Sequence, residues 1–292
     1  MKLAIDTYPL TKRLGIFEAM NAFKNAGFDC IDLSYYGLSD DSPLFGEEYK
    51  EYSKKLREHL DSIGLVCNQA HAPFKLKYED EWNESCERWV SLTRSIESAS
   101  ILGAKTIVVH FVFPPEDANT SLREYNLKFY RALIPVAEKH GIKIAVENLF
   151  WYDKKRNCIR SAMSDPAEQC SFIKELDSPL FVACVDIGHA AITGAEPEEY
   201  ILGMDSSLLS AVHIQDGDYR DDRHTLPFFG QFNWTAIMKA FRKIGYKGDL
   251  NFEVFKYFKY MPDELLPDAL RMAHSAGRHL ISIFEDDGET NA

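Results

Sequence analysis

The chain has 292 residues, too many for a small disulfide-held fold and about right for one large α/β domain. Hydrophobic residues make up 46% of it, which is enough for a sizeable core. Its formal net charge of −12 argues against nucleic acid as the main partner, because clustered Lys and Arg supply the affinity for phosphate backbones.

Hydropathy and cysteine usage indicate the compartment. No apolar run approaches the length of a membrane span, and the opening residues, MKLAIDTYPL, lack a signal-peptide pattern. The six cysteines show no paired short spacing, and Cys67 and Cys184 lie inside strand-like runs. We therefore expect free, buried thiols in a cytoplasmic protein that does not contact a membrane.

Strand-like and helix-like segments alternate along the chain. Short apolar runs predict strands, and longer segments with a period of 3.6 residues predict helices. The strands are predicted at 3–6, 29–35, 66–71, 106–110, 143–147, 181–186, 209–215 and 249–253. The helices are predicted at 16–26, 47–63, 79–102, 122–140, 165–176, 196–202, 233–244 and 263–284.

Glycines separate many of these helices from the strands that follow. They are Gly27, Gly64, Gly103, Gly141 and Gly245. Short connections of this kind are typical of parallel β-α-β units. Eight such units without a linker predict an α/β fold, a single (β/α)₈ TIM barrel over residues 1–286. Residues 287–292 are expected to form a flexible C-terminal tail.

Six successive strands end in side chains that bind hard or borderline metal ions. These residues are His71, His110, Glu147, Asp186, His213 and Glu253. In a parallel barrel, the carboxyl ends of all strands open on one face, where active sites are built. We therefore expect these six side chains to converge, although they are far apart in the sequence.

A structural alternative is a layer of polar residues that satisfy one another at the barrel mouth. Asp186 would then only cap a helix, and His189, three residues later, would be an ordinary core histidine. However, the carboxylates of Glu147, Asp186 and Glu253 would repel one another or take up protons if no cation lay between them. A bound divalent metal removes that difficulty.

The loop after the seventh strand, residues 213–230, is rich in charged groups. Asp216, Asp218 and Asp221 have an ordinary interpretation as an acidic turn in solvent, whereas Asp222 and His224 are stronger candidates for a site. Aromatic residues also follow the strand ends and are expected either to exclude water from a site or to pack as loop residues. They are Phe74, Phe111, Phe113, Phe150, Trp151 and Phe255.

Several short motifs carry a resemblance to a known superfamily. They are VEN at 146–148, VDIGHA at 185–190, HIQDGD at 213–218, DRHTLPFFG at 222–230 and FEVF at 252–255. The chain resembles the xylose-isomerase-like TIM-barrel superfamily of sugar phosphate isomerases and epimerases, with ketose 3-epimerase and inosose isomerase or dehydratase relatives. The resemblance implies one divalent metal, held by Glu147, Asp186, His213 and Glu253, and a substrate contact from His189.

The resemblance also implies a reaction. We expect isomerisation or epimerisation of a ketose, sugar phosphate or inosose-type ketone through a metal-stabilised cis-enediolate, with Glu147 and Glu253 exchanging the proton. The small-molecule sugar or polyol-derived substrate would be contacted by His71, His110, His189, Arg220 and His224. The superfamily's loop arginine would fall on Tyr219, next to Arg220. Manganese, magnesium, cobalt and zinc all suit these ligands, and a homo-oligomer is compatible with them.

Three other functions remain alternatives. Endonuclease IV belongs to the same superfamily and binds three zinc ions, and its ligand order also finds matches in this chain. The matching residues are His71, His110, Glu147, Asp186, His189, His213, Asp222, His224 and Glu253. The FEVF context and the Phe228-Phe229 pair depart from the nuclease pattern. A dehydratase of the inosose type shares the enolising step, and a barrel that only binds sugar is a third, weaker alternative.

Overall fold

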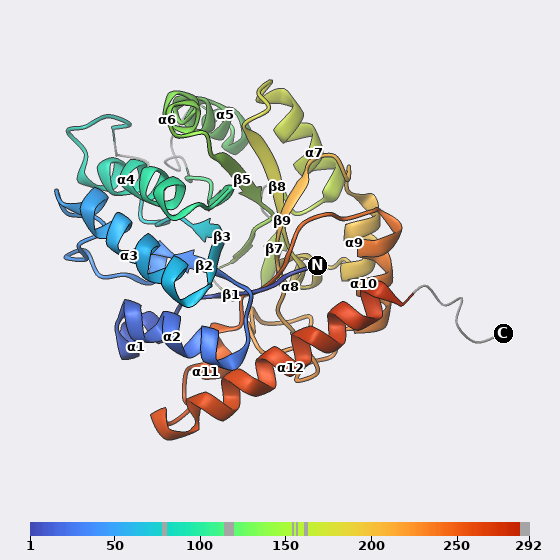
Figure 1. Ribbon diagram of the computed structural model, residues 1–292. Coiled ribbons are helices and arrows are strands. Elements are labelled where there is room, and N and C mark those ends of the chain that lie inside the picture. The colour runs from blue at the N-terminus through green and yellow to red at the C-terminus, as the bar shows by residue number, and fades with distance from the viewer. Residues whose placement is uncertain (78–80, 114–119, 154, 156, 161–162, 287–292) are drawn as a thin grey trace.

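The computed structural model describes residues 1–77, 81–113, 120–153, 155, 157–160 and 163–286. Eight parallel strands form a barrel with helices around it (Figure 1). In spatial order they are β10 (Leu250–Phe252), β1 (Leu3–Asp6), β2 (Cys30–Ser34), β3 (Val66–His71), β4 (Thr106–Val109), β5 (Lys143–Glu147), β8 (Phe181–Asp186) and β9 (Leu209–His213). The predicted α/β TIM barrel is therefore confirmed.

A β-bridge between the ends of the last two strands, β9 and β10, completes the barrel. Ile214, just beyond β9, forms a parallel bridge with Phe252 of β10. Its amide donates to the carbonyl of Asn251 at 2.8 Å, and its carbonyl accepts from the amide of Glu253 at 3.0 Å. These bonds place Glu253 beside the end of β9, where His213 lies.

The helices lie outside the strands (Figure 1). They are α1 (Leu10–Leu14), α2 (Ile16–Ala26), α3 (Tyr49–Ile63), α4 (Glu87–Leu102), α5 (Leu122–Ala132), α6 (Ile134–His140), α7 (Pro166–Glu175), α8 (Ile187–Ile192), α9 (Pro197–Gly203), α10 (Trp234–Lys243), α11 (Phe255–Phe258) and α12 (Leu266–Glu285), with 3₁₀ turns at Tyr35–Gly37 and Asp263–Leu265. Four of the five glycines noted in the sequence cap a helix in the left-handed conformation. The fifth, Gly245, has a φ of 70° just after α10.

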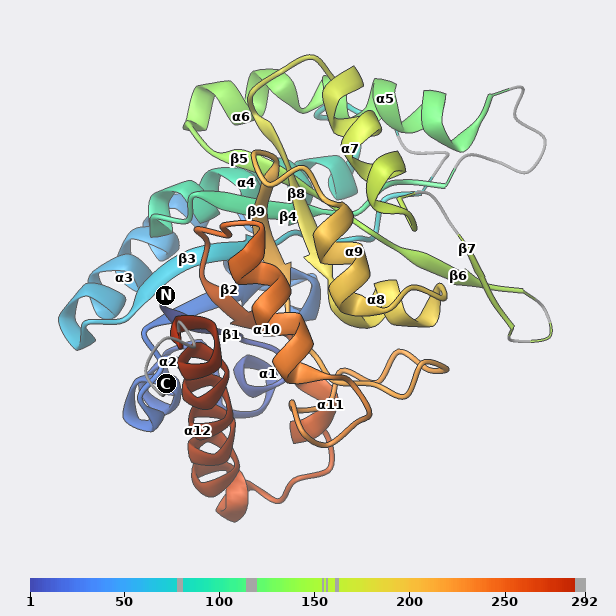
Figure 2. The same cartoon turned by 90° about the vertical axis from the view of Figure 1, so that its right-hand side faces the viewer.

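Two predicted helices differ from the structure, and some elements were not predicted. The predicted helix 79–102 begins only at Glu87, because Asn83 turns the chain by accepting the amide of Ser85 at 2.8 Å. The predicted helix 122–140 breaks at Leu133, since Pro135 has no N–H for an unbroken helix. A hairpin of β6 (Phe150–Tyr152) and β7 (Cys158–Arg160), not predicted at all, extends from the barrel (Figure 2).

The inside of the barrel has an apolar part and a polar part. Small apolar side chains of β4, β5, β8 and β9 form one cluster: Val108, Ala145, Val182, Cys184 and Ala211. Toward β2, β3 and β10, the interior is polar. There Asp32 Oδ2 accepts hydrogen bonds from Gln69 Nε2 at 2.6 Å and from Asn251 Nδ2 at 2.8 Å. This buried network lies next to His213.

Other predictions concern the whole chain. None of the six cysteines, all of which lie among the described residues, forms a disulfide, as expected, and four of them are buried: Cys30, Cys67, Cys170 and Cys184. Among the described residues, no helix is long and apolar enough to cross a membrane. The boundaries of the barrel domain, 1–286, stay a prediction. The proposed tail, 287–292, lies outside the described residues.

Candidate functional site

The strand-end residues meet at one end of the barrel. His71, Glu147, Asp186 and His213 are the last residues of β3, β5, β8 and β9. The parallel register sets Asp186 directly beside His213. The other two, His110 and Glu253, come one residue after β4 and β10.

Four of these residues form a compact, buried group. Ligand atoms of Glu147, Asp186, His213 and Glu253 all lie within 4.8 Å of one another. Nδ1 of His213 lies 2.9 Å from Oε1 of Glu147 and 3.3 Å from Oε2 of Glu253. Three carboxylates and one imidazole form a donor set that suits a hard or borderline divalent cation. The residues present therefore fit such an ion.

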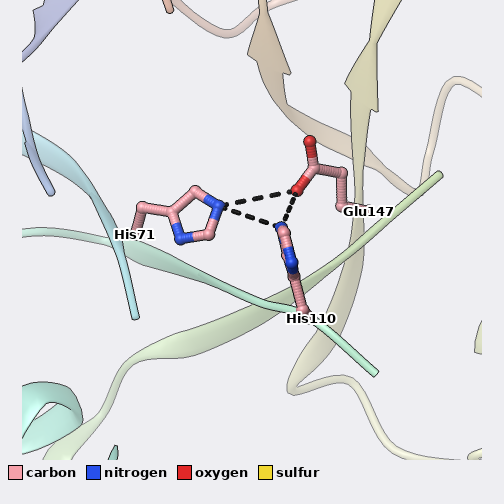
Figure 3. A group of neighbouring side chains, drawn as sticks. All are labelled: His71, His110 and Glu147. Carbon is pink, nitrogen blue, oxygen red and sulfur yellow. Dashed lines mark hydrogen bonds and ion pairs between the residues drawn. The ribbon is translucent and has the colours of Figure 1, made fainter. Parts of the chain in front are cut away.

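A second group lies beside it (Figure 3). Nε2 of His110 lies 2.8 Å from Oε2 of Glu147, and Nε2 of His71 lies 3.2 Å from Nε2 of His110. The Nδ1 atom of His71 donates to the carbonyl of Ala72 at 3.0 Å, which leaves Nε2 to face the site. His71, His110 and Glu147 are also close enough to share a cation.

A third group includes the histidine that follows Asp186. Asp186, His189 and His224 lie within the same 4.8 Å limit. His189 donates from Nδ1 to the carbonyl of Asn148 at 2.9 Å, and His224 donates from Nδ1 to the carbonyl of Glu253 at 3.0 Å. Both rings therefore present Nε2 toward the site.

Asp186 has a structural role as well. It is the N-cap of α8 and accepts the amide of His189 at 2.8 Å. The side chain of Asn148 bonds both the amide and the carbonyl of Asp186, at 2.7 and 2.8 Å. Gln215 Nε2 reaches both carboxylate oxygens of Asp186, at 3.0 and 2.9 Å. The capping and the ligand interpretations of Asp186 are thus compatible.

The two glutamates differ in their electrostatic surroundings. Burial opposes ionisation of Glu147, but His213 and His110 hold the pKa of its carboxyl well below the ordinary value. Burial raises the pKa of Glu253 above its ordinary value. Burial also lowers the pKa of His110 to about 4, despite the neighbouring Glu147.

Carboxylates raise the pKa values of the two histidines in the third group, and Asp222 lies close to both rings. Its Oδ1 lies 2.9 Å from Nε2 of His224 and 3.6 Å from Nε2 of His189. Burial disfavours the charged rings, but the Asp186 carboxylate, with help from Asp222, raises the pKa of His189 to about 10. Asp222 likewise raises the pKa of His224 to about 9.

A cavity of about 710 Å³ opens over these groups. This volume lies in the range of about 300–1,000 Å³ that is usual for small-molecule sites. All six aromatic residues noted after the strand ends line it: Phe74, Phe111, Phe113, Phe150, Trp151 and Phe255. The cavity thus has aromatic walls around a polar, titratable floor.

Comparison with known families agrees with the fold. The family model described as Xylose isomerase-like TIM barrel matches residues 20–276. The chain belongs to this family.

Sequence relatives span most of the barrel. The protein y4fM of Sinorhizobium fredii, described as uncharacterized, is 32% identical over 265 residues, which cover 82% of this chain and 81% of the relative. MJ1311 of Methanocaldococcus jannaschii, also described as uncharacterized, is 26% identical over 211 residues, covering 70% of this chain and 68% of the relative.

Solved structures share the fold of this xylose isomerase-like barrel. A D-tagatose 3-epimerase-like protein aligns with a TM-score of 0.74, at 21% identity over 98% of each chain. The 3-keto-D-glucoside 4-epimerase YcjR of E. coli has a TM-score of 0.69, at 21% identity over 94% of this chain and 99% of its own. The IOLI protein, solved with a bound zinc atom, has a TM-score of 0.70, at 17% identity over 97% and 99%.

Most of the predicted site residues of this xylose isomerase-like barrel reach the cavity or its floor. The cavity is lined by His71, His110, Glu147, His189, His224 and Glu253, and also by Asp222. Asp186 and His213 are fully buried behind them. Arg220 is not brought to the cavity: its side chain is exposed, and its amide bonds the Asp218 carboxylate in a turn.

The sequence analysis missed the contribution of the first two strands. Asp6 ends β1, and Tyr36 follows β2 in a 3₁₀ turn. The Tyr36 hydroxyl lies 3.1 Å from Oδ2 of Asp6 and 3.4 Å from Oε1 of Glu253. Asp6 ends its strand like the other six residues and could have been found by the same signal. Tyrosine is not a usual metal ligand, so the position of Tyr36 just past a strand gave no comparable signal.

Proposed function

We propose that this protein is a divalent-metal-dependent isomerase or epimerase of a small keto sugar: a ketose, a sugar phosphate or an inosose-type ketone. The observation that carries the proposal is the position of Glu147 and Glu253. Both carboxylates contact Nδ1 of His213, in a buried group with Asp186, and both line the aromatic cavity. A pair of carboxylates in such a place suits proton exchange at a substrate carbon.

Glu147, Asp186, His213 and Glu253 would hold the metal. When bound, a divalent cation acts as a Lewis acid that makes the carbon next to a carbonyl more acidic. The resemblance of the chain to zinc-containing and epimerase structures agrees with this role, although those similarities concern the fold.

The residues of the chain would carry the proton. Glu147 and Glu253 come from strands separated by β8 and β9. Their carboxylates would therefore approach a bound substrate from different directions. One carboxylate would remove the proton beside the carbonyl, and the other would return it on the opposite face. His71, His110, His189 and His224 would orient the substrate oxygens through their ring nitrogens.

Deuterium incorporation tests this chemistry. A carboxylate base exchanges its proton with solvent, so incubation with the right ketose in D₂O should place deuterium next to the carbonyl. Glu147→Gln and Glu253→Gln keep the shape but remove the base, and each should reduce the exchange by about 100-fold or more. Glu138→Gln, on the exposed surface of α6, is the matched control and should leave exchange unchanged.

Metal content must be measured in the same variants, because both glutamates are proposed ligands. Loss of exchange with metal retained assigns the proton transfer to the carboxylate itself. Normal exchange in both glutamine variants would refute the proposed roles. Release of water with formation of an unsaturated ketone would instead identify a dehydratase, which shares the enolising step.

The two additional ligand groups favour one competing function, a three-metal phosphodiesterase like endonuclease IV. His71, His110 and Glu147 form one such group, and Asp186, His189 and His224 form the other. Against it stands the net charge of −12. Cleavage of DNA at an abasic site, with three metals per chain and no deuterium exchange from a broad panel of ketoses, would establish the nuclease instead.

The cysteines support a proposal about location. None of the six, all within the described part of the chain, forms a disulfide, and four of them are buried. Free thiols are the rule in reducing compartments. We therefore propose that the protein works in the cytoplasm.

A further inference from the structure

A second cavity lies next to the one that holds the proposed active site. It has a volume of about 780 Å³ and is bounded by α1, the 3₁₀ turn after β2, the loop 38–43 and Tyr52 of α3. It shares three lining residues with the first cavity: Tyr36, Phe74 and Phe255. We name the cavity over the ligand groups the inner cavity and this second one the outer cavity.

A ridge of aromatic rings separates the two cavities. The ring of Tyr36 lies 5.2 Å from that of Phe74 and 6.5 Å from that of Phe255, between ring centroids. Tyr8 lies 5.7 Å from Tyr36 and 5.6 Å from Phe255 and belongs to the outer cavity. The two cavities therefore adjoin along this ridge, so a ligand long enough to pass over it could contact residues of both cavities.

The shape of the ridge depends on a glycine. A Cβ atom at Gly37 would come within 2.4 Å of Cδ2 of Tyr8. No L side chain fits there without displacing the tyrosine ring. The absence of a side chain at position 37 therefore allows Tyr8 to pack against the outer side of the ridge. Tyr36, the residue before, uses its hydroxyl on the inner side, where it contacts Glu253 at 3.4 Å.

The polar groups of the outer cavity suit hydroxyl groups better than an anion. Ser39 and Ser42 offer hydroxyls, of which the Ser39 hydroxyl donates to the Asp41 carboxylate. Behind them, the buried Thr11 Oγ1 has no hydrogen-bond partner among the described residues. Lys12 contributes one cation and Asp41 one carboxylate. Phosphate sites gather several cations or backbone N–H groups, whereas here a carboxylate would oppose the single lysine.

We infer that the outer cavity binds a second sugar ring, so that the substrate is a keto sugar carrying a glycosyl group rather than a free monosaccharide. Aromatic faces and hydroxyl-bonding side chains together match a neutral pyranose, which has apolar C–H faces and polar edges. The inference rests on the proposed function only in placing the keto sugar in the inner cavity. The glycosyl group crosses the ridge at Tyr36 and Phe74.

Binding of matched sugars tests the inference without requiring turnover. Fructose is compared with three glucosyl-fructoses, linked through O3, O4 or O6, by calorimetric titration of the metal-loaded protein. At least one disaccharide should bind about tenfold more tightly than fructose, which corresponds to about 1.4 kcal/mol. Saturation-transfer NMR should show contact between the protein and the glucosyl ring of that disaccharide.

Substitutions test whether the outer cavity causes the higher affinity for the disaccharide. Ser42→Trp fills the outer cavity and should reduce the preference for the disaccharide to less than about twofold, while the affinity for fructose stays the same. Ser62→Trp, on the exposed end of α3, is the matched control and should retain the full preference. Circular dichroism checks that both variants are folded, and Lys12→Ala provides a second, smaller change in the same cavity.

Several outcomes would overturn the inference. These are equal affinities for fructose and all three disaccharides, a preference that survives Ser42→Trp, and no measurable binding of any of the four sugars. If fructose 6-phosphate instead gains affinity that Ser42→Trp removes, the outer cavity binds an anion and the neutral-ring assignment is wrong. Failure of the proposed function has a different signature: the disaccharide binds as expected, but no sugar of the panel exchanges deuterium.

Discussion

Nε2 of His213 lies 3.6 Å from Oδ2 of Asp32, deep inside the barrel. Both side chains are buried, and Gln69 and Asn251 hold the same Asp32 oxygen by hydrogen bonds. A proton on Nε2, facing this carboxylate, would leave the Nδ1 lone pair of His213 free for a metal ion held together with Glu147 and Glu253. We infer that Asp32, although 3.6 Å is longer than a hydrogen bond, favours the Nε2-protonated form of this proposed metal ligand without lining the cavity.

Asp32→Asn should weaken divalent metal binding by about 10–100-fold, the usual effect of losing a residue that orients a histidine ligand. The amide keeps the size of the side chain, so the fold should survive. Affinity is measured by competition with a fluorescent chelator, and Asp205→Asn on the surface serves as the control. Unchanged affinity in Asp32→Asn would contradict the positioning role.

Substitutions of Asp186 should separate its two roles. Asp186→Ala removes both the proposed ligand and the α8 cap, so it should lose the metal and about 1 kcal/mol of stability. Asp186→Asn keeps an acceptor for the amide of His189 and should therefore lose metal affinity while retaining most of the stability. Full metal occupancy after dialysis of either variant against a mild chelator would refute the ligand assignment.

His71 and His110 are predicted to contact substrate rather than to bind metal in the working enzyme. His71→Ala should therefore keep one ion per chain and reduce deuterium exchange by about tenfold or more. The measurement is metal analysis of protein equilibrated with a small excess of zinc. Three ions in the wild type, falling when His71 is replaced, would show that the group in Figure 3 is a metal site.

Asp216 should be essential for the loop that carries His224. Its buried carboxylate accepts from the amides of Gly217, Phe228 and Phe232 and from Nε1 of Trp234, at 2.8–3.2 Å. Asp216→Ala would leave several buried N–H groups unsatisfied and should cost at least about 3 kcal/mol of stability. Urea unfolding followed by tryptophan fluorescence measures this loss.

The control for that experiment lies in the same loop. Asp221 is exposed, so Asp221→Ala should change the free energy of unfolding by no more than about 0.5 kcal/mol. Equal effects of the two substitutions would show that the loop is held in another way. The difference also distinguishes the two aspartates, which the sequence analysis placed together in one solvated turn.

Asp29 predicts a pH dependence of stability. Its carboxylate accepts from the amide of Leu3 at 2.8 Å and from Arg278 of α12 at 2.9 Å. Partial burial raises the pKa of Asp29, but these bonds outweigh it and lower the pKa below its ordinary value. A lowered pKa stabilises the fold above the unfolded-state pKa of about 3.9, and this contribution is lost as the pH falls through the folded-state pKa.

Asp29→Asn should therefore cost about 0.5–1 kcal/mol at pH 7, a modest value because the pair is partly exposed. The difference between wild type and variant should shrink as the pH falls below about 4. Urea unfolding from pH 7 to pH 3.5 measures it, with Arg278→Gln expected to follow the same profile. A difference that is constant across this range would show that the charge of Asp29 does not contribute.

Local sequence patterns determined the barrel and the residues that end its strands. β1, β3, β5 and helix α2 have the predicted bounds, because alternating strand and helix periods and the glycine caps are properties of neighbouring residues. The strand-end residues of the candidate site followed from the position of each residue along its own strand, which in a parallel barrel decides which end of the barrel the residue reaches.

Tertiary structure decided the rest. Tyr36 meets Glu253 across 217 positions of the chain, and His213 meets Asp32 across the barrel interior. The outer cavity likewise joins α1 and the loop 38–43 to Phe255, near the other end of the sequence. Arg220, expected to contact substrate because it lies next to the position of the superfamily's loop arginine, is exposed in a turn where its amide donates to the Asp218 carboxylate. Such contacts depend on how strands and loops far apart in sequence pack in three dimensions, and no short-range pattern records that packing.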